Sequence, residues 1–159
     1  VFRTPAFASI AALGVWLMIV FTVWLMTAQF LYESLFGPGS PPSLAAFIEE
    51  VFNTSQGQAL MLWGNLIGFC FAVVVLATAV VSIPLLLDRD VGTAVAVQTS
   101  IRVVLRNPVV IAVWGLMVVG VLLLGALPLL VGLAIAVPVL GHATWHLYRR
   151  AVVPAGDIR

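Results

Sequence analysis

Two histidines near the end of the chain are the residues best suited to chemistry. His142 and His146 are four positions apart in the segment GHATWHLYRR (141–150), so on a helix they share a face about one turn apart. That spacing can bind a metal ion, and a buried histidine can hold haem. Zinc takes three or four ligands, however, and no Cys, Asp or Glu lies close by in the sequence. We therefore expect no bound metal or haem. His142 and His146 are still the candidate metal ligands of this chain, provided that another helix or another chain supplies the remaining ligands.

The residues around the histidines are typical of a membrane–water interface, where amphipathic rings and arginines gather. We predict four interfacial anchors in this segment: Trp145, Tyr148, Arg149 and Arg150. His146 lies among these interfacial residues. His142 lies about two turns deeper, roughly 10 Å by helix rise. There we expect a neutral imidazole that is hydrogen-bonded to a neighbouring helix or to a backbone carbonyl.

The composition excludes several function classes. Hydrophobic residues make up 63% of the chain and charged residues 8%, whereas soluble domains carry about 25% charged residues. The chain has no lysine and its arginines form no single run, so we expect no nucleic-acid partner. Cys70 is alone, so the given sequence can form no internal disulfide. No Ser/His/Asp set or glycine-rich phosphate loop is recognisable, and we predict that the protein is not an enzyme.

The hydropathy pattern predicts an all-α, polytopic transmembrane helical bundle that forms one domain over residues 1–159. Residues 107–148 carry no charge and would extend about 63 Å as a helix, which is roughly two crossings of a ~30 Å hydrocarbon core. Gly125-Ala126-Leu127-Pro128 is the expected turn between them. We predict four spans, at about residues 5–35, 58–87, 108–126 and 128–148, with Pro84 bending or ending the second.

Two short amphipathic helices are predicted at the membrane surface. The first, residues 43–53, follows the GPGSPP loop (37–42) and has Ser43 as its N-cap. The second, residues 91–106, is capped by Asp90 and directs Arg102 and Arg106 towards anionic headgroups. Bound lipid is therefore an expected ligand of the protein.

Small residues recur on one face of the second predicted span. Gly64, Gly68 and Ala72 are spaced four apart, a pattern that lets another helix approach closely. We predict that they form a helix-packing face, and that Asn65 beside them hydrogen-bonds across a helix interface. Thr27 and Gln29 in the first span are expected to bond to a neighbouring helix or to reach the headgroups.

The distribution of charges predicts the topology. Four spans put all seven arginines on one side of the membrane and leave Glu33, Glu49 and Glu50 on the other. Because cytoplasmic loops are enriched in arginine and lysine, both visible ends of the chain are expected in the cytoplasm.

Three motifs carry a resemblance to a known family: SIPLLLDRDV (82–91), Arg106-Asn107-Pro108, and PVLGHATWHLYRRAV (138–152). They resemble a family of bacterial, mostly proteobacterial, multispanning inner-membrane proteins of unknown function. Some members are labelled as similar to cytochrome c oxidase subunit I. The resemblance implies a bacterial inner-membrane location and a further hydrophobic hairpin before Val1. It implies no haem or copper site, because oxidase subunit I has many more spans and a larger set of histidines than His142 and His146.

Two functional hypotheses follow. The first is a non-catalytic accessory or structural subunit, packed beside other integral membrane subunits of a larger respiratory or photosynthetic complex. The alternative is a small-molecule carrier or channel that acts as an oligomer. The two histidines leave a third, weaker hypothesis, a haem- or metal-binding membrane protein. Ion-coupled transporters place ionisable residues in mid-membrane, and this chain has none there apart from His142.

Overall fold

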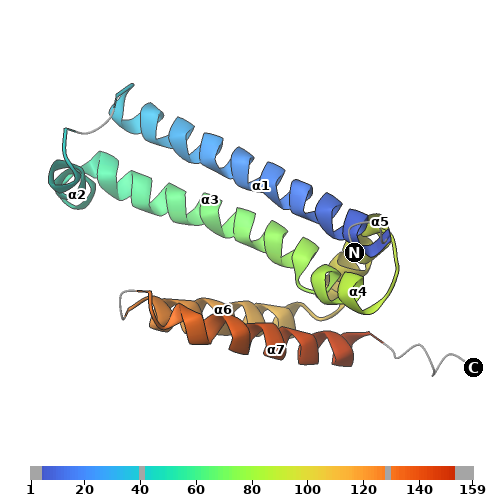
Figure 1. The fold of residues 1–159 in the computed structure, drawn as a ribbon. Helices are drawn as coiled ribbons and strands as arrows, with labels where there is room; N and C mark the ends of the chain where they lie inside the picture. The colour runs from blue at the N-terminus through green and yellow to red at the C-terminus, as the bar shows by residue number, and fades with distance from the viewer. Residues whose placement is uncertain (1–4, 40–41, 128–129, 153–159) are drawn as a thin grey trace, which may run out of the picture. The chain divides into compact units, whose positions relative to one another are not determined.

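The computed structural model describes residues 5–39, 42–127 and 130–152. All regular structure in these ranges is α-helical, which confirms the predicted all-α class. The helices are α1 (Pro5–Phe36), α2 (Leu44–Asn53), α3 (Ser55–Ala79), α4 (Ser82–Asp88), α5 (Thr93–Arg106), α6 (Pro108–Ala126) and α7 (Leu133–Ala151), shown in Figure 1. Two compact units can be distinguished. One comprises residues 14–75, and the other comprises the described residues up to 13 and from 76 onward.

Among the described residues, three helical segments are long and apolar enough to cross a membrane: Phe7–Phe36, Ser55–Asp88 and Pro108–Ala126. They correspond to the first three predicted spans. The fourth predicted span, residues 128–148, corresponds to α7, which is not among the three candidates. The second half of α7 carries two histidines, Thr144 and two arginines, so its mean hydropathy is lower than that of α6.

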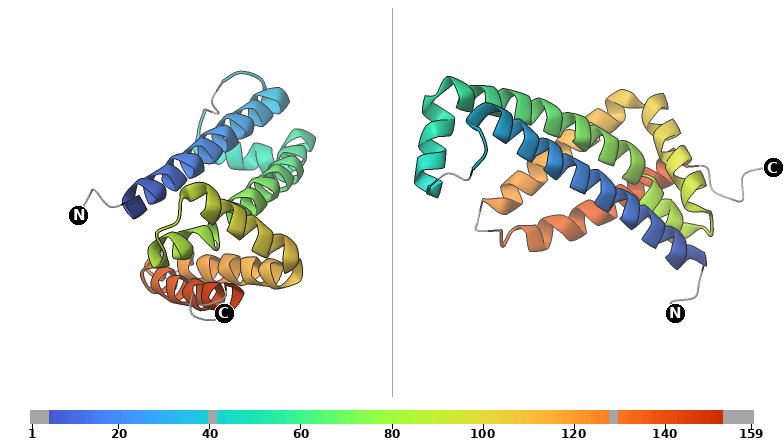
Figure 2. Two further views of the ribbon diagram at one scale, coloured as in Figure 1. Left: turned by 90° about the vertical axis from the view of Figure 1, so that its right-hand side faces the viewer. Right: turned by 90° about the horizontal axis from the view of Figure 1, so that it is seen from above.

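In the unit of residues 14–75, α1 and α3 run side by side and α2 lies crosswise at their end (Figure 2). The Ser43 hydroxyl accepts a hydrogen bond from the Ala46 N–H at 3.1 Å, so Ser43 caps α2 as predicted. The Tyr32 ring stacks on Phe36 and contacts Phe47 with ring centroids 6.2 Å apart, which packs α2 against α1. The cap and the ring contacts therefore hold the first turn of α2 against the end of α1.

The turn between α2 and α3 is tighter than predicted. The second span was expected to begin near residue 58, but α3 begins at Ser55. Thr54 explains the difference, because its hydroxyl accepts from the Gly57 N–H at 3.0 Å and donates to the Glu50 carbonyl at 2.6 Å. One side chain thus ends α2 and caps α3. A Cβ at Gly57 would overlap the Val51 backbone, so the turn needs glycine there.

The long second candidate span is interrupted at Val80 and Val81, where α3 gives way to α4. Pro84 accounts for the break, since it has no N–H to donate to Val80 four residues earlier and its ring crowds that carbonyl. The Val81 N–H is held by the Ser100 hydroxyl of α5 at 3.2 Å, and the Ser82 hydroxyl donates to the Thr78 carbonyl. Two fully buried serines, Ser82 and Ser100, therefore satisfy backbone groups at the interruption between the two helices.

The unit that contains α4 to α7 has its core where α4, α5 and α7 meet. Its buried side chains include Val81, Ser82, Leu85, Leu86, Ala96, Ser100 and Tyr148. The helix α5 starts at Thr93 rather than 91, and its N-cap is Gly92 without a side-chain bond, so the predicted cap by Asp90 is wrong. The Thr93 hydroxyl bonds instead to the Ser9 carbonyl of α1 at 2.9 Å.

The helices α6 and α7 form a hairpin and run side by side (Figure 1). α7 begins at Leu133, five residues later than predicted, and Leu130 before it has a φ of +67°. Of the expected turn, Gly125 and Ala126 belong to the last turn of α6, and Pro128 lies outside the described residues. Gly132 packs directly on Gly125, so the hairpin closes backbone against backbone.

We expect Gly132→Ala to destabilise this hairpin. The new Cβ would lie 2.7 Å from the Gly125 carbonyl oxygen and 2.8 Å from its Cα, which are backbone atoms that cannot rotate away. Overpacking of this kind costs about 1–3 kcal/mol. Thermal unfolding in one detergent, followed by circular dichroism, measures the loss.

Gly120→Ala is the matched control, because a Cβ there meets no atom within 4 Å. It should leave the unfolding midpoint unchanged or raise it slightly, since alanine favours helix over glycine. Equal midpoints for the two variants would show that the close Gly125–Gly132 contact is absent in the protein.

Candidate functional site

The small-residue face of α3 meets side chains of α1 rather than its backbone. A Cβ at Gly64 would lie 4.0 Å from Leu31, and one at Gly68 would lie 4.0 Å from the Trp24 indole nitrogen, which is ordinary contact. Ala72 is exposed. The small residues leave a hollow of about 380 Å³, lined by Leu17, Val20, Phe21, Trp24, Gly68, Phe71, Ala72 and Val75. The packing role of Gly64, Gly68 and Ala72 stays a prediction.

Asn65 bonds within its own helix, so its amide nitrogen does not form the predicted bond across a helix interface. Its amide nitrogen donates to the Met61 carbonyl at 2.7 Å. The side chain is exposed and lies on a row with Leu62, Phe69 and Ala72, all of them exposed. The spacing of three, four and three residues puts these four on one side of the helix. We call this row the exposed α3 stripe.

Most other polar side chains of the long helices also turn back on their own helix. The hydroxyls of Thr22, Thr27 and Thr144 each donate to the carbonyl four residues earlier, at 2.7–2.8 Å. Gln29 donates to Glu33 on the same helix at 2.8 Å. The expected bonds of Thr27 and Gln29 to a neighbouring helix are therefore replaced by bonds within α1.

A hydrogen bond between α4 and α7 joins residues 60 positions apart. The Tyr148 hydroxyl donates to the Asp88 carboxylate at 2.7 Å, and the Arg89 Nε lies 3.6 Å from the same oxygen. Tyr148 is 2% exposed, so this predicted interfacial anchor faces the protein interior. Its ring also contacts Trp145 with centroids 5.4 Å apart.

The other predicted anchors lie closer to the surface. Trp145 is half-buried, and Arg149 and Arg150 are exposed in the last turn of α7. Positive charge there also complements the partial negative charge of the helix C-terminus. The sequence showed the residue types of this segment, but only the structure separates Tyr148, which holds α4, from its exposed neighbours.

Both histidines are exposed on α7. The Nδ1 atom of His142 lies 3.0 Å from the Pro138 carbonyl of the same helix. Because a carbonyl only accepts, this bond requires hydrogen on Nδ1 and leaves Nε2 with a lone pair in the neutral ring. Within the described ranges, no three His, Cys, Asp or Glu side chains gather closely enough to hold a metal ion.

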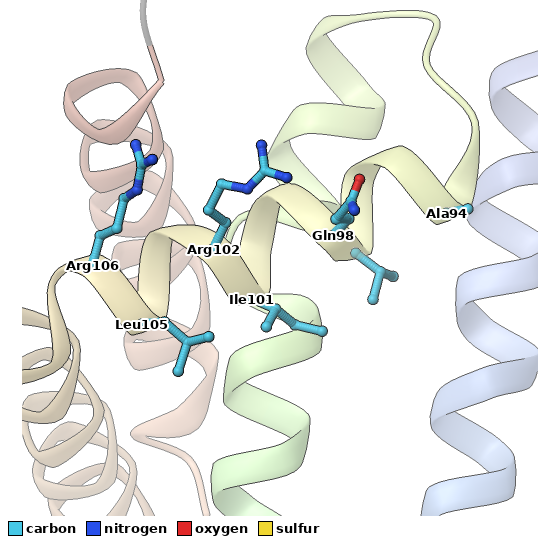
Figure 3. Close-up of a pocket in the computed structure, with 7 residues that line it drawn as sticks. Ala94, Gln98, Ile101, Arg102, Leu105 and Arg106 are labelled. Carbon is cyan, nitrogen blue, oxygen red and sulfur yellow. The ribbon is translucent and has the colours of Figure 1, made fainter.

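The helix α5 presents two parallel rows of side chains along a hollow of about 570 Å³. Figure 3 shows Gln98, Arg102 and Arg106 directed to one edge, with Ile101 and Leu105 directed to the other. Val97 and Ala94 complete the apolar lining. The opposite side of α5 is anchored in the core through Ala96 and Ser100. Sequence periodicity indicated the shared face of Arg102 and Arg106, but not the hollow or the places of Gln98 and Val97 beside it.

Residues 1–88 match a family described as predicted integral membrane protein (DUF2189). The matched segment covers more than half of the chain and ends at Asp88, the acceptor of the Tyr148 bond. It confirms the expected relation to a family of membrane proteins. No curated protein and no solved structure matches the chain.

We expect Tyr148→Phe to loosen α7 from α4, because it removes the hydroxyl bonded to Asp88 and keeps the ring. Hydrogen bonds to charged groups contribute about 1.5–3 kcal/mol. The unfolding midpoint in detergent should fall accordingly.

Tyr32→Phe is the matched control. It also removes a tyrosine hydroxyl, but within the described residues this hydroxyl forms no hydrogen bond, and the ring keeps its stacking on Phe36. Its midpoint should not move. If both variants shift the midpoint equally, the Asp88–Tyr148 bond contributes nothing to stability.

Proposed function

Because the chain belongs to the DUF2189 family of predicted integral membrane proteins, we propose that it works within the membrane as a non-catalytic accessory subunit of a larger complex. Its partners in this proposal are other integral membrane subunits. From the resemblance to bacterial inner-membrane proteins, the proposed host is a respiratory or photosynthetic complex of that membrane. The exposed α3 stripe is the proposed contact.

The observation that carries this proposal is Asn65 in the middle of an apolar surface. By helix rise it lies about 15 Å from the start of α3, inside the Ser55–Asp88 candidate span. Its amide nitrogen bonds to Met61, but its carbonyl oxygen is left on an exposed face between Leu62 and Phe69, which are each 67% exposed. A polar atom in that position is costly against lipid and favourable against a helix that donates a hydrogen bond.

The spacing of the stripe fits a helix partner. Leu62, Asn65, Phe69 and Ala72 follow each other at three, four and three residues, which is the seam of left-handed helix pairs. Small Ala72 at one end of the stripe also lines the hollow that Gly68 and Phe71 border. A transmembrane helix of another subunit can therefore pack its side chains along this row.

The chemistry of the long helices also supports an accessory role. The sequence has no Asp, Glu, Lys or Arg between residues 4 and 32, 51 and 87, or 107 and 148. Proton relays and ion-coupled pumps need such groups within the membrane. Thr22 and Thr27 of α1 donate to carbonyls of their own helix.

The proposal includes a four-span topology in which α7 returns to the side where α6 starts. All seven arginines then lie on one side, which is the cytoplasmic side by the positive-inside rule. Both visible ends of the chain are cytoplasmic in this arrangement, and the loop at residues 37–42 faces the periplasm.

The topology is tested with single cysteines in a Cys70→Ser background and a thiol reagent that does not cross membranes. Ser40→Cys and Gly156→Cys, two positions outside the described residues, should differ. Ser40→Cys should react in intact cells, and Gly156→Cys should react only after the membrane is opened. Reaction of both in intact cells would contradict the four-span arrangement.

The accessory role is tested by purification from native membranes in mild detergent, with quantitative mass spectrometry of the proteins retained. We expect one integral membrane partner at fixed stoichiometry. Asn65→Leu should reduce its retention about 3- to 30-fold, the value of one hydrogen bond between membrane helices.

Thr22→Val is the matched control, because it removes a polar group whose bond lies within α1. It should retain the partner fully. Equal retention by Asn65→Leu would exclude the α3 stripe as the contact. Substrate flux through liposomes that contain the purified protein alone would instead support a carrier or channel.

A further inference from the structure

We propose that the hollow along α5 is a binding site for one anionic phospholipid. The phosphate would lie on the polar row formed by Gln98, Arg102 and Arg106, and an acyl chain would lie on the apolar row formed by Val97, Ile101 and Leu105. This inference concerns a lipid at the membrane surface and is independent of the proposed protein partner at α3.

The position of α5 along the chain sets its depth. It starts five residues after Asp88, where one candidate span ends, and it ends at Arg106, two residues before Pro108, where the next candidate span begins. A helix that joins the end of one span to the start of the next on the same side lies at the membrane surface. Lipid phosphates are found at this depth.

The charges on α5 complement a phosphodiester. Arg102 and Arg106 are four residues apart, so both guanidinium groups can reach one group on the same edge of the helix. Both are exposed, and within the described part of the chain neither forms an ion pair. Guanidinium groups bind phosphate oxygens in bidentate fashion, and the Gln98 amide adds a further donor one turn earlier.

The apolar row fits the other half of the same ligand. Val97, Ile101 and Leu105 are spaced four apart, directly beside the polar row, and Leu105 is 75% exposed. Figure 3 shows Ile101 and Leu105 directed away from the edge that carries the arginines. A ligand with a negative head and a hydrocarbon tail satisfies both rows, whereas an inorganic phosphate or an acidic peptide leaves the apolar row uncovered.

The test is native mass spectrometry of the full-length protein in neutral detergent, incubated with phosphatidylglycerol or with phosphatidylcholine. We expect one phosphatidylglycerol to be retained, with phosphatidylcholine retained about tenfold less. The Arg102→Gln/Arg106→Gln double variant should lose this preference. The Arg149→Gln/Arg150→Gln double variant removes the same charge from another exposed site and should keep it.

A second variant, Leu105→Glu, places a negative charge in the hollow at an exposed position, so it should fold normally and still lower phosphatidylglycerol retention about tenfold. Leu105→Glu tests the phospholipid site even if the Arg102→Gln/Arg106→Gln variant does not fold. Equal retention of the two lipids by the parent protein would overturn the proposal. Unchanged retention by both α5 variants would overturn it as well.

Discussion

Lipid supplies no hydrogen bonds, and most of the structure follows from that constraint. A backbone group without a partner in hydrocarbon costs several kcal/mol, so the long apolar segments are helical. The side chains obey the same rule. Thr22, Thr27 and Thr144 donate to carbonyls of their own helices, which satisfies each hydroxyl without a second helix. Helices with such internally satisfied side chains can be packed, moved or exposed without leaving polar groups unpaired.

The constraint is most severe where a helix is broken. Pro84 has no N–H to donate to the Val80 carbonyl, and at the break between α3 and α4 the Val81 N–H is bonded to the Ser100 hydroxyl. α4 is held by two further contacts, its packing on α5 and the hydrogen bond that Tyr148 donates to Asp88. The break is thus tolerated because buried serine hydroxyls bond to the Val81 N–H and to the Thr78 carbonyl, while Tyr148 holds the end of α4 through Asp88.

Local patterns were enough to predict much of this fold. The bounds of α1, α2, α5 and α6 lie within two residues of those predicted, because Pro5, Ser43, Arg106 and Pro108 mark helix ends in the sequence. The late start of α7 was not predictable, since it depends on the contact of Gly132 with Gly125 across the hairpin. The partner of Tyr148 was also hidden, because no local pattern connects residues 60 positions apart.

In the candidate site too, sequence patterns predicted which residues share a helix face, but not which contacts their side chains make. Hydropathy and spacing located Arg102, Arg106 and the small residues of α3, which all lie on regular helices. They could not show that Asn65 would bond to Met61 and leave one oxygen outward, because the choice between a helix's own carbonyl and a neighbour depends on how closely that neighbour approaches. In the structure the nearest α1 atoms to the α3 glycines are side chains, so the backbones stay apart.

Tyr148 also determines what the two histidines can do. Its burial fixes the rotation of α7 about its axis, and at 100° per residue His142 and His146 project to the far side, where both are exposed. The bond from His142 Nδ1 to the Pro138 carbonyl further fixes that ring and turns its Nε2 lone pair outward. Within the described residues no other potential ligand faces the pair. Any metal or haem bound there would therefore need further ligands from outside the described residues, for example from another subunit, on a face of α7 that the Asp88–Tyr148 bond leaves exposed.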